Sequence, residues 1–307
     1  MSVAFLCPGQ ASQKVGMGFD LYNNTKLGKK YFDIANDIMG LDIQNIIFNG
    51  PEEELKQTQY TQPAIYIVSV IVGELLIKKG LKPLCAAGHS LGEYSALALA
   101  QSFDFATGLE LVKIRAEAMQ NACKLNKSTM AAVIGLEDEK VVKICQSHAN
   151  EGIVVAANFN AKSQVVISGE IRAIKSIIPI MKEAGALKVV ELNVSGAFHS
   201  PLMSSAKEIL SDKLLSTNIN DSTFPIYSNV SASPVSSAEE IRYALIQQLE
   251  SPVLWHQTIT QMIKDGVKNA IEVGPGRILQ GLSKRIDRSL NMNGVEYLEE
   301  IVNFKHV

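Results

Sequence analysis

Short apolar runs alternate with longer helical patterns through the first 122 residues. Val3 to Cys7 and Leu84 to Ala87 are continuous apolar runs of the kind found in buried strands, and Pro8-Gly9 ends the first of them. Apolar residues at helical spacing follow each run, and they predict helices over 26–39, 63–79 and 103–123. Since parallel strands are connected by crossover helices, this order predicts a parallel sheet covered by helices on both faces.

The pattern changes near Asn126. Strands are expected over 130–136, 153–157, 165–168 and 187–194, with helices over 137–149 and 171–184, the second helix ending at Gly185. The resulting order, strand-helix-strand-strand-helix-strand, is typical of a ferredoxin-like unit. About 65 residues are enough for such a unit to fold as a lobe of its own.

After Ser195 the alternation of strands and helices resumes. Helices are expected over 202–215, 238–249 and 253–265, strands over 224–228 and 269–273, and a last helix runs through Arg285 after the turn Gly274-Pro275-Gly276. The simplest interpretation is one α/β domain interrupted by an insert. Its first part is 1–126, the inserted subdomain is 127–194, and its second part is 195–307. The cleft between two such lobes is a common place for a ligand.

Composition excludes several classes of partner. The chain has 307 residues, and 29 basic against 31 acidic residues leave a formal charge of −2 without a long block of either sign. Nucleic acid and anionic membrane surfaces are therefore not expected as partners. The four cysteines are scattered without a C-x-x-C pair, which argues against a disulfide framework or a zinc site and fits a reducing compartment.

No segment is expected to target or anchor the chain to a membrane. The run Met1 to Leu6 lacks the basic residues of a signal peptide. The longest apolar stretch, Ala64 to Ile77, is short for a membrane span and contains Glu74. We expect a soluble, cytoplasmic protein.

The most informative stretch is Gly88-His89-Ser90-Leu91-Gly92, which lies between an apolar run and a helix-forming run from Glu93 to Ala100. A serine between two glycines at a strand-to-helix turn has the pattern of a nucleophile elbow. The sharp turn exposes the hydroxyl, and the glycines remove side chains that would block it. The first amide of the following helix then points to where an oxyanion would form. The pattern predicts a nucleophile but not a reaction.

A serine hydroxyl needs a base to take its proton, and His199 is the best candidate. It lies in the segment 195–201, rich in Gly, Ser and Pro, where the chain returns from the insert to the main domain. Catalytic groups concentrate on such loops, although an ordinary loop histidine is the alternative. We expect the His89 side chain to point away from the serine, His256 to pack, and His148 and His306 to be solvated.

No carboxylate stands out as a third member of a triad. Arg115, midway along the expected helix 103–123, is ambiguous, because a helical arginine is usually solvated or paired with a neighbour such as Glu117. From these residues alone the chain is an acyl-transfer enzyme with a Ser/His pair, and its acceptor stays open.

Four stretches add a resemblance to a known family. They are Pro-Gly-Gln-Ala-Ser-Gln at 8–13, Gly-His-Ser-Leu-Gly-Glu-Tyr at 88–94, Gly-Ala-Phe-His-Ser-Pro-Leu-Met at 196–203 and Glu-Val-Gly-Pro-Gly at 272–276. In this order they resemble the malonyl-CoA:acyl-carrier-protein transacylases of fatty acid synthesis, over nearly the whole chain. The resemblance implies an α/β-hydrolase-like large domain with a ferredoxin-like insert.

The resemblance also implies a role for each matching residue of the catalytic centre. Ser90 would carry the malonyl ester, and His199 would be the base. A Gln-Leu-x-x-Pro segment, here Gln248 to Pro252, would orient the histidine in place of an acid. The backbone amides of Gln10 and Leu91 would form the oxyanion hole.

A second group of matching residues would bind the acyl group. Arg115 corresponds to an arginine that binds the malonyl carboxylate, a use that suits a planar, bidentate donor and disfavours acetyl groups. Bulk at Phe198 and Leu91 fits the malonyl-selective subtype. Further pocket residues implied by the resemblance are Gln62, Asn158 and Asn160. One departure is Ala11, which stands where the family has glycine, so that a positive φ there would be strained.

The implied reaction is a ping-pong transfer. Malonyl-CoA acylates Ser90, CoA leaves, and the pantetheine thiol of holo acyl carrier protein takes the acyl group. No cofactor is expected beyond the CoA thioester substrate, and the protein is expected to be a monomer. One alternative is a thioesterase or esterase with water as acceptor, against which Arg115 and the insert argue. The other is a non-catalytic subunit that binds a carrier protein, against which the intact pair of Ser90 and His199 argues.

Overall fold

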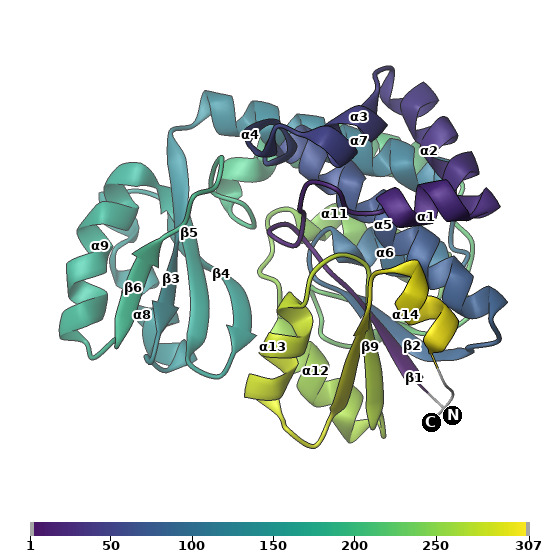
Figure 1. The fold of residues 1–307 in the computed structure, drawn as a ribbon. Coiled ribbons are helices and arrows are strands. Elements are labelled where there is room, and N and C mark those ends of the chain that lie inside the picture. Colours follow the sequence, from purple (N-terminus) through teal and green to yellow (C-terminus); the bar gives the residue numbers. More distant parts are fainter. Residues whose placement is uncertain (1–2, 305–307) are drawn as a thin grey trace.

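Two β-sheets, one in each of two lobes, organise residues 3–304, which the computed structural model describes (Figure 1). The six-stranded sheet of the larger lobe has the order β10-β9-β1-β2-β7-β8. Every neighbouring pair is parallel except β7 with β8. Its strands are β1 (Val3–Cys7), β2 (Pro83–Gly88), β7 (Ile226–Tyr227), β8 (Pro234–Val235), β9 (Asn269–Val273) and β10 (Asn291–Val295).

Helices cover both faces of this sheet. Phe5 of β1 faces a core that includes α5 (Thr58–Lys78) and α7 (Phe105–Leu125), whereas the next residue, Leu6, faces a core formed with α12 (Trp255–Lys264) and α13 (Ile278–Ile286). All five residues of β1 are buried, which explains why this strand is a continuous apolar run. The helix after the elbow is α6 (Gly92–Leu99).

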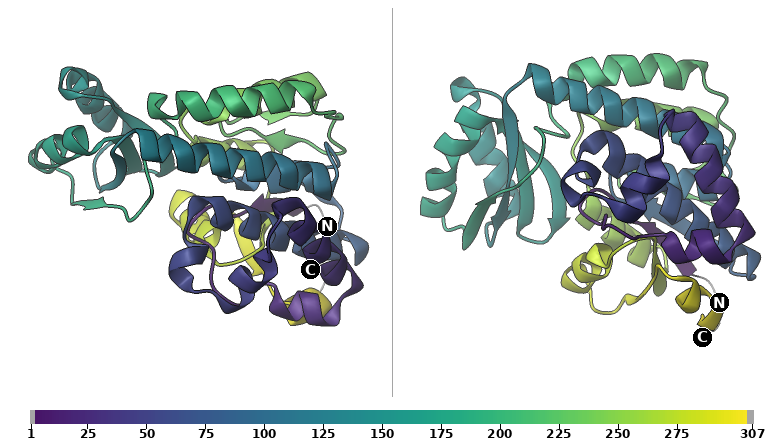
Figure 2. Two further views of the ribbon diagram at one scale, coloured as in Figure 1. Left: turned by 90° about the horizontal axis from the view of Figure 1, so that it is seen from above. Right: turned by 45° about the horizontal axis from the view of Figure 1, so that its top comes forward.

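The remaining helices of the larger lobe pack in the same core as α5 and α7, and Figure 2 gives two further views of their arrangement. They are α1 (Phe19–Asn24), α2 (Lys26–Met39), α3 (Ile43–Asn49), α4 (Glu52–Leu55), α10 (Ser204–Ser216), α11 (Ala238–Gln248), α14 (Leu298–Asn303) and the 3-10 helix η2 (Pro201–Met203).

The smaller lobe is an antiparallel sheet with helices on one face. Its strands β3 (Ser128–Ile134), β4 (Val154–Ala161), β5 (Gln164–Glu170) and β6 (Lys188–Glu191) have the order β4-β5-β3-β6. The helices α8 (Asp138–Ser147) and α9 (Ile171–Glu183) pack on it around a separate core, and the 3-10 helix η1 (Ala149–Glu151) follows α8. The long helix α7 runs from the larger lobe toward this sheet and leads into β3 (Figure 2).

Helix α5 is longer than its apolar run indicated. It begins at Thr58, before Pro63, so the predicted start at residue 63 was wrong. The helix has 21 residues, so the prediction that this segment is too short to span a membrane was also wrong. By length and hydropathy α5 could cross a membrane. However, 78% of its most apolar window is buried inside the protein, where α5 packs as a core helix.

Other differences from the predicted elements have local causes. The helix predicted over 253–265 begins only at Trp255, because Val253 exchanges backbone hydrogen bonds with Ala157 and Phe159 of β4 (2.8 and 2.9 Å). The helix predicted from 202 is divided into η2 and α10. The helices α1, α3, α4 and α14 and the strand β8 were not predicted, because they are short. The strand β10 was not predicted because its sequence, Asn-Met-Asn-Gly-Val, is not an apolar run. Met1, Ser2 and His306 lie outside the described residues.

Candidate active site

Loops that follow the parallel strands meet at one edge of the larger sheet, the edge where open α/β sheets bind ligands. The loop after β1 carries Gln10, the loop after β2 carries Ser90, and the loop after β7 carries Asn229. A cavity of about 230 Å³ opens there, lined by residues of both lobes. All of the predicted site residues line it except Gln248: Gln10, Gln62, Ser90, Leu91, Arg115, Asn158, Asn160, Phe198 and His199.

Ser90 lies at a strained turn between β2 and α6, with a φ of 51°. The flanking glycines serve the backbone rather than clearing the hydroxyl as expected. A Cβ on Gly88 would lie 1.9 Å from the carbonyl carbon of Gly92, and one on Gly92 would lie 2.1 Å from the carbonyl oxygen of Cys7. Only glycine at both positions lets β1, β2 and the start of α6 approach this closely.

His199 is placed to act as a base toward Ser90. Its Nε2 lies 2.8 Å from the Ser90 Oγ, and its Nδ1 lies 2.9 Å from the carbonyl oxygen of Gln248 and 3.2 Å from that of Ser251. Because carbonyl oxygens only accept, Nδ1 carries the proton, and Nε2 accepts from the serine hydroxyl. Burial and the positive charge of Arg115 lower the His199 pKa to about 3, so the ring is neutral at neutral pH.

The smaller lobe holds the loop that carries His199. The histidine itself has a φ of 57°, in the left-handed region. Ser168 of β5 donates to the carbonyl oxygen of the preceding Phe198 (2.6 Å), and Ser128 of β3 accepts from the amide of Ala197 (3.0 Å). The insert therefore contributes to positioning His199 as well as to lining the cavity.

Arg115 is 0% exposed, which excludes the solvated alternative. Its Nη1 donates to the Gln62 Oε1 (2.6 Å), and its Nη2 donates to the Ser90 Oγ (2.9 Å) and to the Gln248 Oε1 (2.9 Å). Its guanidinium carbon lies 5.5 Å from the centre of the Tyr94 ring. Among residues 3–304 the Nε has no hydrogen-bond partner. A buried guanidinium beside a nucleophile favours an acyl group that carries its own negative charge.

Gln248 contacts His199 through its main chain, whereas its side chain turns to other partners. The Nε2 donates to the Ser90 carbonyl oxygen (3.0 Å) and to the Glu93 Oε2 (2.7 Å), and the Oε1 accepts from Arg115. The orienting acceptors of the histidine are thus two backbone carbonyls at the end of α11.

A sequence model of the acyl transferase domain family matches residues 4–298. The chain belongs to this family. Malonyl CoA-acyl carrier protein transacylase of Bacillus subtilis is 39% identical to it over 300 residues, which cover 97% of this chain and 95% of that protein. An acyl-carrier-protein S-malonyltransferase from Bartonella henselae has a crystal structure that matches with a TM-score of 0.95 at 38% identity, covering 98% of both chains.

A third match is a malonyl-transacylase solved in complex with its type II PKS acyl-carrier protein. It superposes with a TM-score of 0.94 at 38% identity, and 98% of each chain is covered. These relatives confirm the resemblance drawn from the sequence motifs and the mixed α/β fold with a parallel sheet.

Asn229 and Glu93 of this acyltransferase were not singled out from the sequence. Asn229 is buried, accepts from the Ser90 amide (2.7 Å) and donates to the Gly88 carbonyl oxygen (2.6 Å), so it closes the turn that carries Ser90. Its position directly after the predicted strand 224–228, at the carboxyl edge of the sheet, is the signal that could have found it. Glu93 belongs to a quoted motif but was given no role there.

His89, Asn158 and Asn160 line the same cavity as Ser90. As predicted, the His89 side chain is not directed at the serine: its Nε2 lies 2.8 Å from the Asn160 Oδ1 of the smaller lobe, and its ring packs on Trp255 with centroids 5.4 Å apart. Asn158 lines the cavity at an irregularity in the pairing of β4 with β5.

The candidate oxyanion amides of the acyltransferase are those of Gln10 and Leu91, and both residues border the cavity. Within residues 3–304 neither amide donates to another protein group. Ala11, next to Gln10, has a φ of 83°, and its amide donates to the Gln13 side chain (2.8 Å). The positive φ considered from the sequence is therefore present, at a residue that carries a Cβ.

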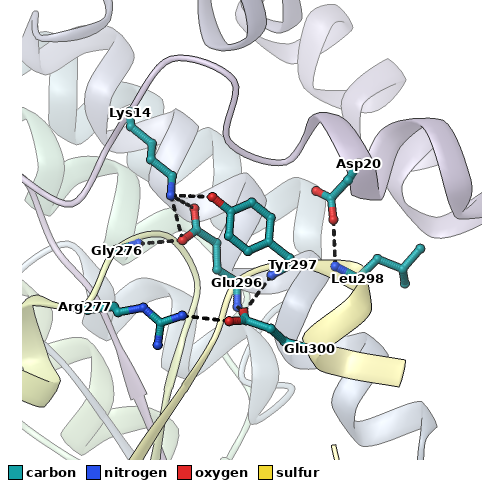
Figure 3. Close-up of polar contacts among 8 residues, drawn as sticks. All are labelled: Lys14, Asp20, Gly276, Arg277, Glu296, Tyr297, Leu298 and Glu300. Atoms are coloured by element: carbon teal, nitrogen blue, oxygen red, sulfur yellow. Dashed lines mark hydrogen bonds and ion pairs between the residues drawn. The ribbon is translucent and has the colours of Figure 1, made fainter. Parts of the chain in front are cut away.

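The loop that carries Gln10 is tied to the C-terminal segment of the acyltransferase (Figure 3). The Lys14 Nζ lies 2.8 Å from the Glu296 Oε1 and 2.7 Å from the Tyr297 hydroxyl, and the Gly276 amide donates to the Glu296 Oε2 (3.4 Å). Arg277 pairs with Glu300 (2.7 Å). The buried Glu296 thus joins the loops that follow β1, β9 and β10.

Within the described part of the chain, no group of three or more His, Cys, Asp or Glu side chains is arranged to hold a metal ion. The residues that line the cavity include Ser90, His199 and Arg115.

Proposed function

We propose that this acyltransferase moves a malonyl group from malonyl-CoA to the phosphopantetheine thiol of holo acyl carrier protein, through an ester on Ser90. The observation that carries the proposal is the buried guanidinium of Arg115, 2.9 Å from the nucleophilic oxygen. An acyl group attached to Ser90 would place a carboxylate one carbon further on within reach of this cation. The names of the relatives, which are malonyl transferases to acyl carrier protein, support the same substrates.

In the first half-reaction Ser90 attacks the thioester carbonyl of malonyl-CoA while the His199 Nε2 takes the hydroxyl proton. The developing oxyanion accepts from the amides of Gln10 and Leu91. When the tetrahedral intermediate collapses, the C–S bond breaks and the proton on Nε2 passes to the departing CoA thiol. Ser90 is left as a malonyl ester and His199 is neutral again.

The second half-reaction runs in reverse with a different thiol. The His199 Nε2 takes the proton of the pantetheine thiol, whose sulfur attacks the ester carbonyl. The C–O bond to Ser90 breaks, and His199 returns the proton to the Ser90 Oγ. No metal or redox cofactor takes part in the proposal.

Selectivity for malonyl follows because an uncharged acyl group would leave the Arg115 guanidinium without an anionic partner. An acetyl group would leave the buried Arg115 cation without a carboxylate partner. The contacts that its methyl group makes do not compensate for this loss of binding free energy. Gln62 and Gln248 hold the guanidinium, and the bulk of Phe198 and Leu91 would crowd a branched acyl group. Asn158 and Asn160 would line the side where the thioester enters.

The proposal includes a finer description of the protein. We assign the larger lobe, 1–126 and 195–307, to the α/β-hydrolase-like class and the insert, 127–194, to the ferredoxin-like class. The order β4-β5-β3-β6 supports the second assignment. We also propose that the protein acts as a cytoplasmic monomer.

Intact-protein mass spectrometry after brief mixing with malonyl-CoA tests the proposal, followed by addition of holo acyl carrier protein. A malonyl adduct that is absent in Ser90→Ala and that moves to the carrier is expected. Rapid loss of the adduct as free malonate without the carrier would make the protein a hydrolase. A protein that forms no adduct but binds the carrier would be a non-catalytic subunit.

A further inference from the structure

Glu93 is a carboxylate in the interior of the larger lobe that no step of the proposed reaction uses. It lies in the first turn of α6, three residues after Ser90, and is 2% exposed. Its Oε2 accepts from the Gln248 Nε2 (2.7 Å) and from the Asn229 amide (3.3 Å). A buried carboxylate is costly unless it is paired, so its place beside the catalytic residues calls for a role.

The hydrogen bonds of Gln248 admit only one orientation of its amide. Its NH₂ group donates to two oxygens, the Glu93 Oε2 and the Ser90 carbonyl oxygen, and its Oε1 accepts from the Arg115 Nη2. If the amide were flipped, its NH₂ group would face the guanidinium NH₂ and its oxygen would face two acceptors. Of the two acceptors of the NH₂ group, only Glu93 is charged, so its carboxylate favours the same orientation as the Arg115 guanidinium does at Oε1.

The orientation of Gln248 in turn places Arg115. With Oε1 toward Arg115, one glutamine oxygen holds Nη2 and the Gln62 Oε1 holds Nη1. The guanidinium is then held at both ends beside Ser90. Without the Gln248 oxygen, Nη2 would keep the Ser90 Oγ as its one acceptor among residues 3–304.

We propose that Glu93 is a positioning residue for malonyl recognition, which orients the Gln248 amide so that Arg115 is held to receive the substrate carboxylate. This inference rests on the proposed function and adds to it a residue that touches neither the substrate nor the reacting atoms. The chain of contacts is Glu93 to Gln248 to Arg115, and it does not pass through His199.

The charge state of Glu93 supports this role. Burial raises its pKa to about 7, opposed by hydrogen bonds from Gln248 and Asn229 and by the positive charge of Arg115. The other titratable group that it influences is Tyr94, whose phenol stays neutral because burial raises its pKa well above the ordinary value. Since the carboxylate is the form that accepts most strongly, the Gln248 amide is held best above about pH 7.

The test compares Glu93→Gln with the unchanged protein, using malonyl-CoA, acetyl-CoA and an uncharged sulfonyl fluoride that reacts with Ser90. Glutamine can donate to Gln248 and so stabilises the flipped amide. We expect malonyl transfer to fall about tenfold or more in kcat/KM, acetyl transfer to fall less, and the sulfonyl fluoride rate to stay within about twofold. Glu272→Gln is the matched control, since Glu272 is also fully buried but accepts from the amides of Leu279 and Gln280. It should leave the ratio of malonyl to acetyl transfer unchanged.

The unchanged protein supplies a second measurement that does not depend on how the variant folds. Its malonyl transfer should rise with pH through about 7, and the sulfonyl fluoride rate should not follow. Equal losses with all three reagents in Glu93→Gln, or an unchanged malonyl preference, would overturn the inference. Parallel pH profiles for the two reagents in the unchanged protein would also overturn it. If the unchanged protein takes no malonyl group at all, the proposed function itself fails, an outcome distinct from the others.

Discussion

The Nη2 of Arg115 lies 2.9 Å from the Oγ of Ser90, in a site where the guanidinium is fully buried. The same oxygen lies 2.8 Å from the His199 Nε2. Ser90 thus donates to a neutral imidazole and accepts from a permanent cation. Burial and the charge of this cation lower the pKa of His199, and the same cation could pair with a charged acyl group.

Replacement of this cation should change selectivity more than it changes nucleophile reactivity. In Arg115→Ala, kcat/KM for malonyl-CoA should fall by about a hundredfold or more, because two charge-assisted hydrogen bonds to the substrate carboxylate are lost. Acetyl transfer should fall less or increase. Lys113→Ala, on the same helix, is the control. A malonyl preference that survives in Arg115→Ala would show that the carboxylate is bound elsewhere.

The depressed pKa of His199 predicts an unusual acid tolerance of the nucleophile. A base works only when deprotonated, so lowering its pKa from 6.5 to about 3 extends the active range toward acid. Inactivation of Ser90 by an uncharged sulfonyl fluoride should therefore stay nearly constant from about pH 8 down to about pH 5. A rate that declines with a midpoint near the ordinary histidine value would contradict the buried, neutral ring.

Asn229 should matter to both stability and turnover. Asn229→Ala leaves the Ser90 amide and the Gly88 carbonyl without their side-chain partner, at a cost of about 2–4 kcal/mol in the free energy of unfolding. We also expect kcat to fall more than KM rises, because the serine is displaced. Urea denaturation and steady-state kinetics measure the two effects. Asn291→Ala, at an exposed position, should stay within about 0.5 kcal/mol of the unchanged protein.

The strain at Ala11 can be relieved. A residue with a Cβ at φ 83° destabilises the folded state by about 1–2 kcal/mol. Glycine removes this strain, but its larger entropy in the unfolded state offsets part of the stabilisation. Ala11→Gly should raise the free energy of unfolding by about 0.5–1 kcal/mol. Ala184→Gly, at an ordinary φ of −71°, should instead lower it. If both changes destabilise, Ala11 is not strained.

The contact between Lys14 and Glu296 should couple the oxyanion loop to the C-terminal segment. A double-mutant cycle with Lys14→Ala and Glu296→Gln should give a coupling energy of about 0.5–1 kcal/mol that decreases in high salt, since the Lys14 side chain is 45% exposed. We expect Lys14→Ala to lower kcat more than Arg277→Ala does, because Lys14 lies on the loop of Gln10. Equal effects on kcat would limit the contact to a structural role.

The local sequence pattern predicted the bounds of those strands and helices whose formation depends mainly on their own residues. The strands Val3–Cys7 and Asn269–Val273 and the helix Lys26–Met39 have the predicted bounds, because a continuous apolar run or a helical spacing ends at a clear boundary. Short helices such as α3 and α4 were missed, because their formation depends on packing against neighbouring elements.

For the candidate active site too, some features could be predicted from the sequence and others only from the structure. Motifs of the sequence by themselves determined the residue types at the nucleophile, the candidate base and the family, because a backbone turn or a chemical group constrains each within a few adjacent positions. Tertiary structure alone decided that Arg115 is buried against Ser90. It also decided that Gln248 contacts His199 through its backbone carbonyl and Arg115 through its side-chain amide. The contacts of Asn229 with the Ser90 amide and of Glu93 with Gln248 likewise came only from the structure. These contacts join residues far apart in the chain, and their distances and burial exist only once the parallel strands have brought their carboxyl ends together.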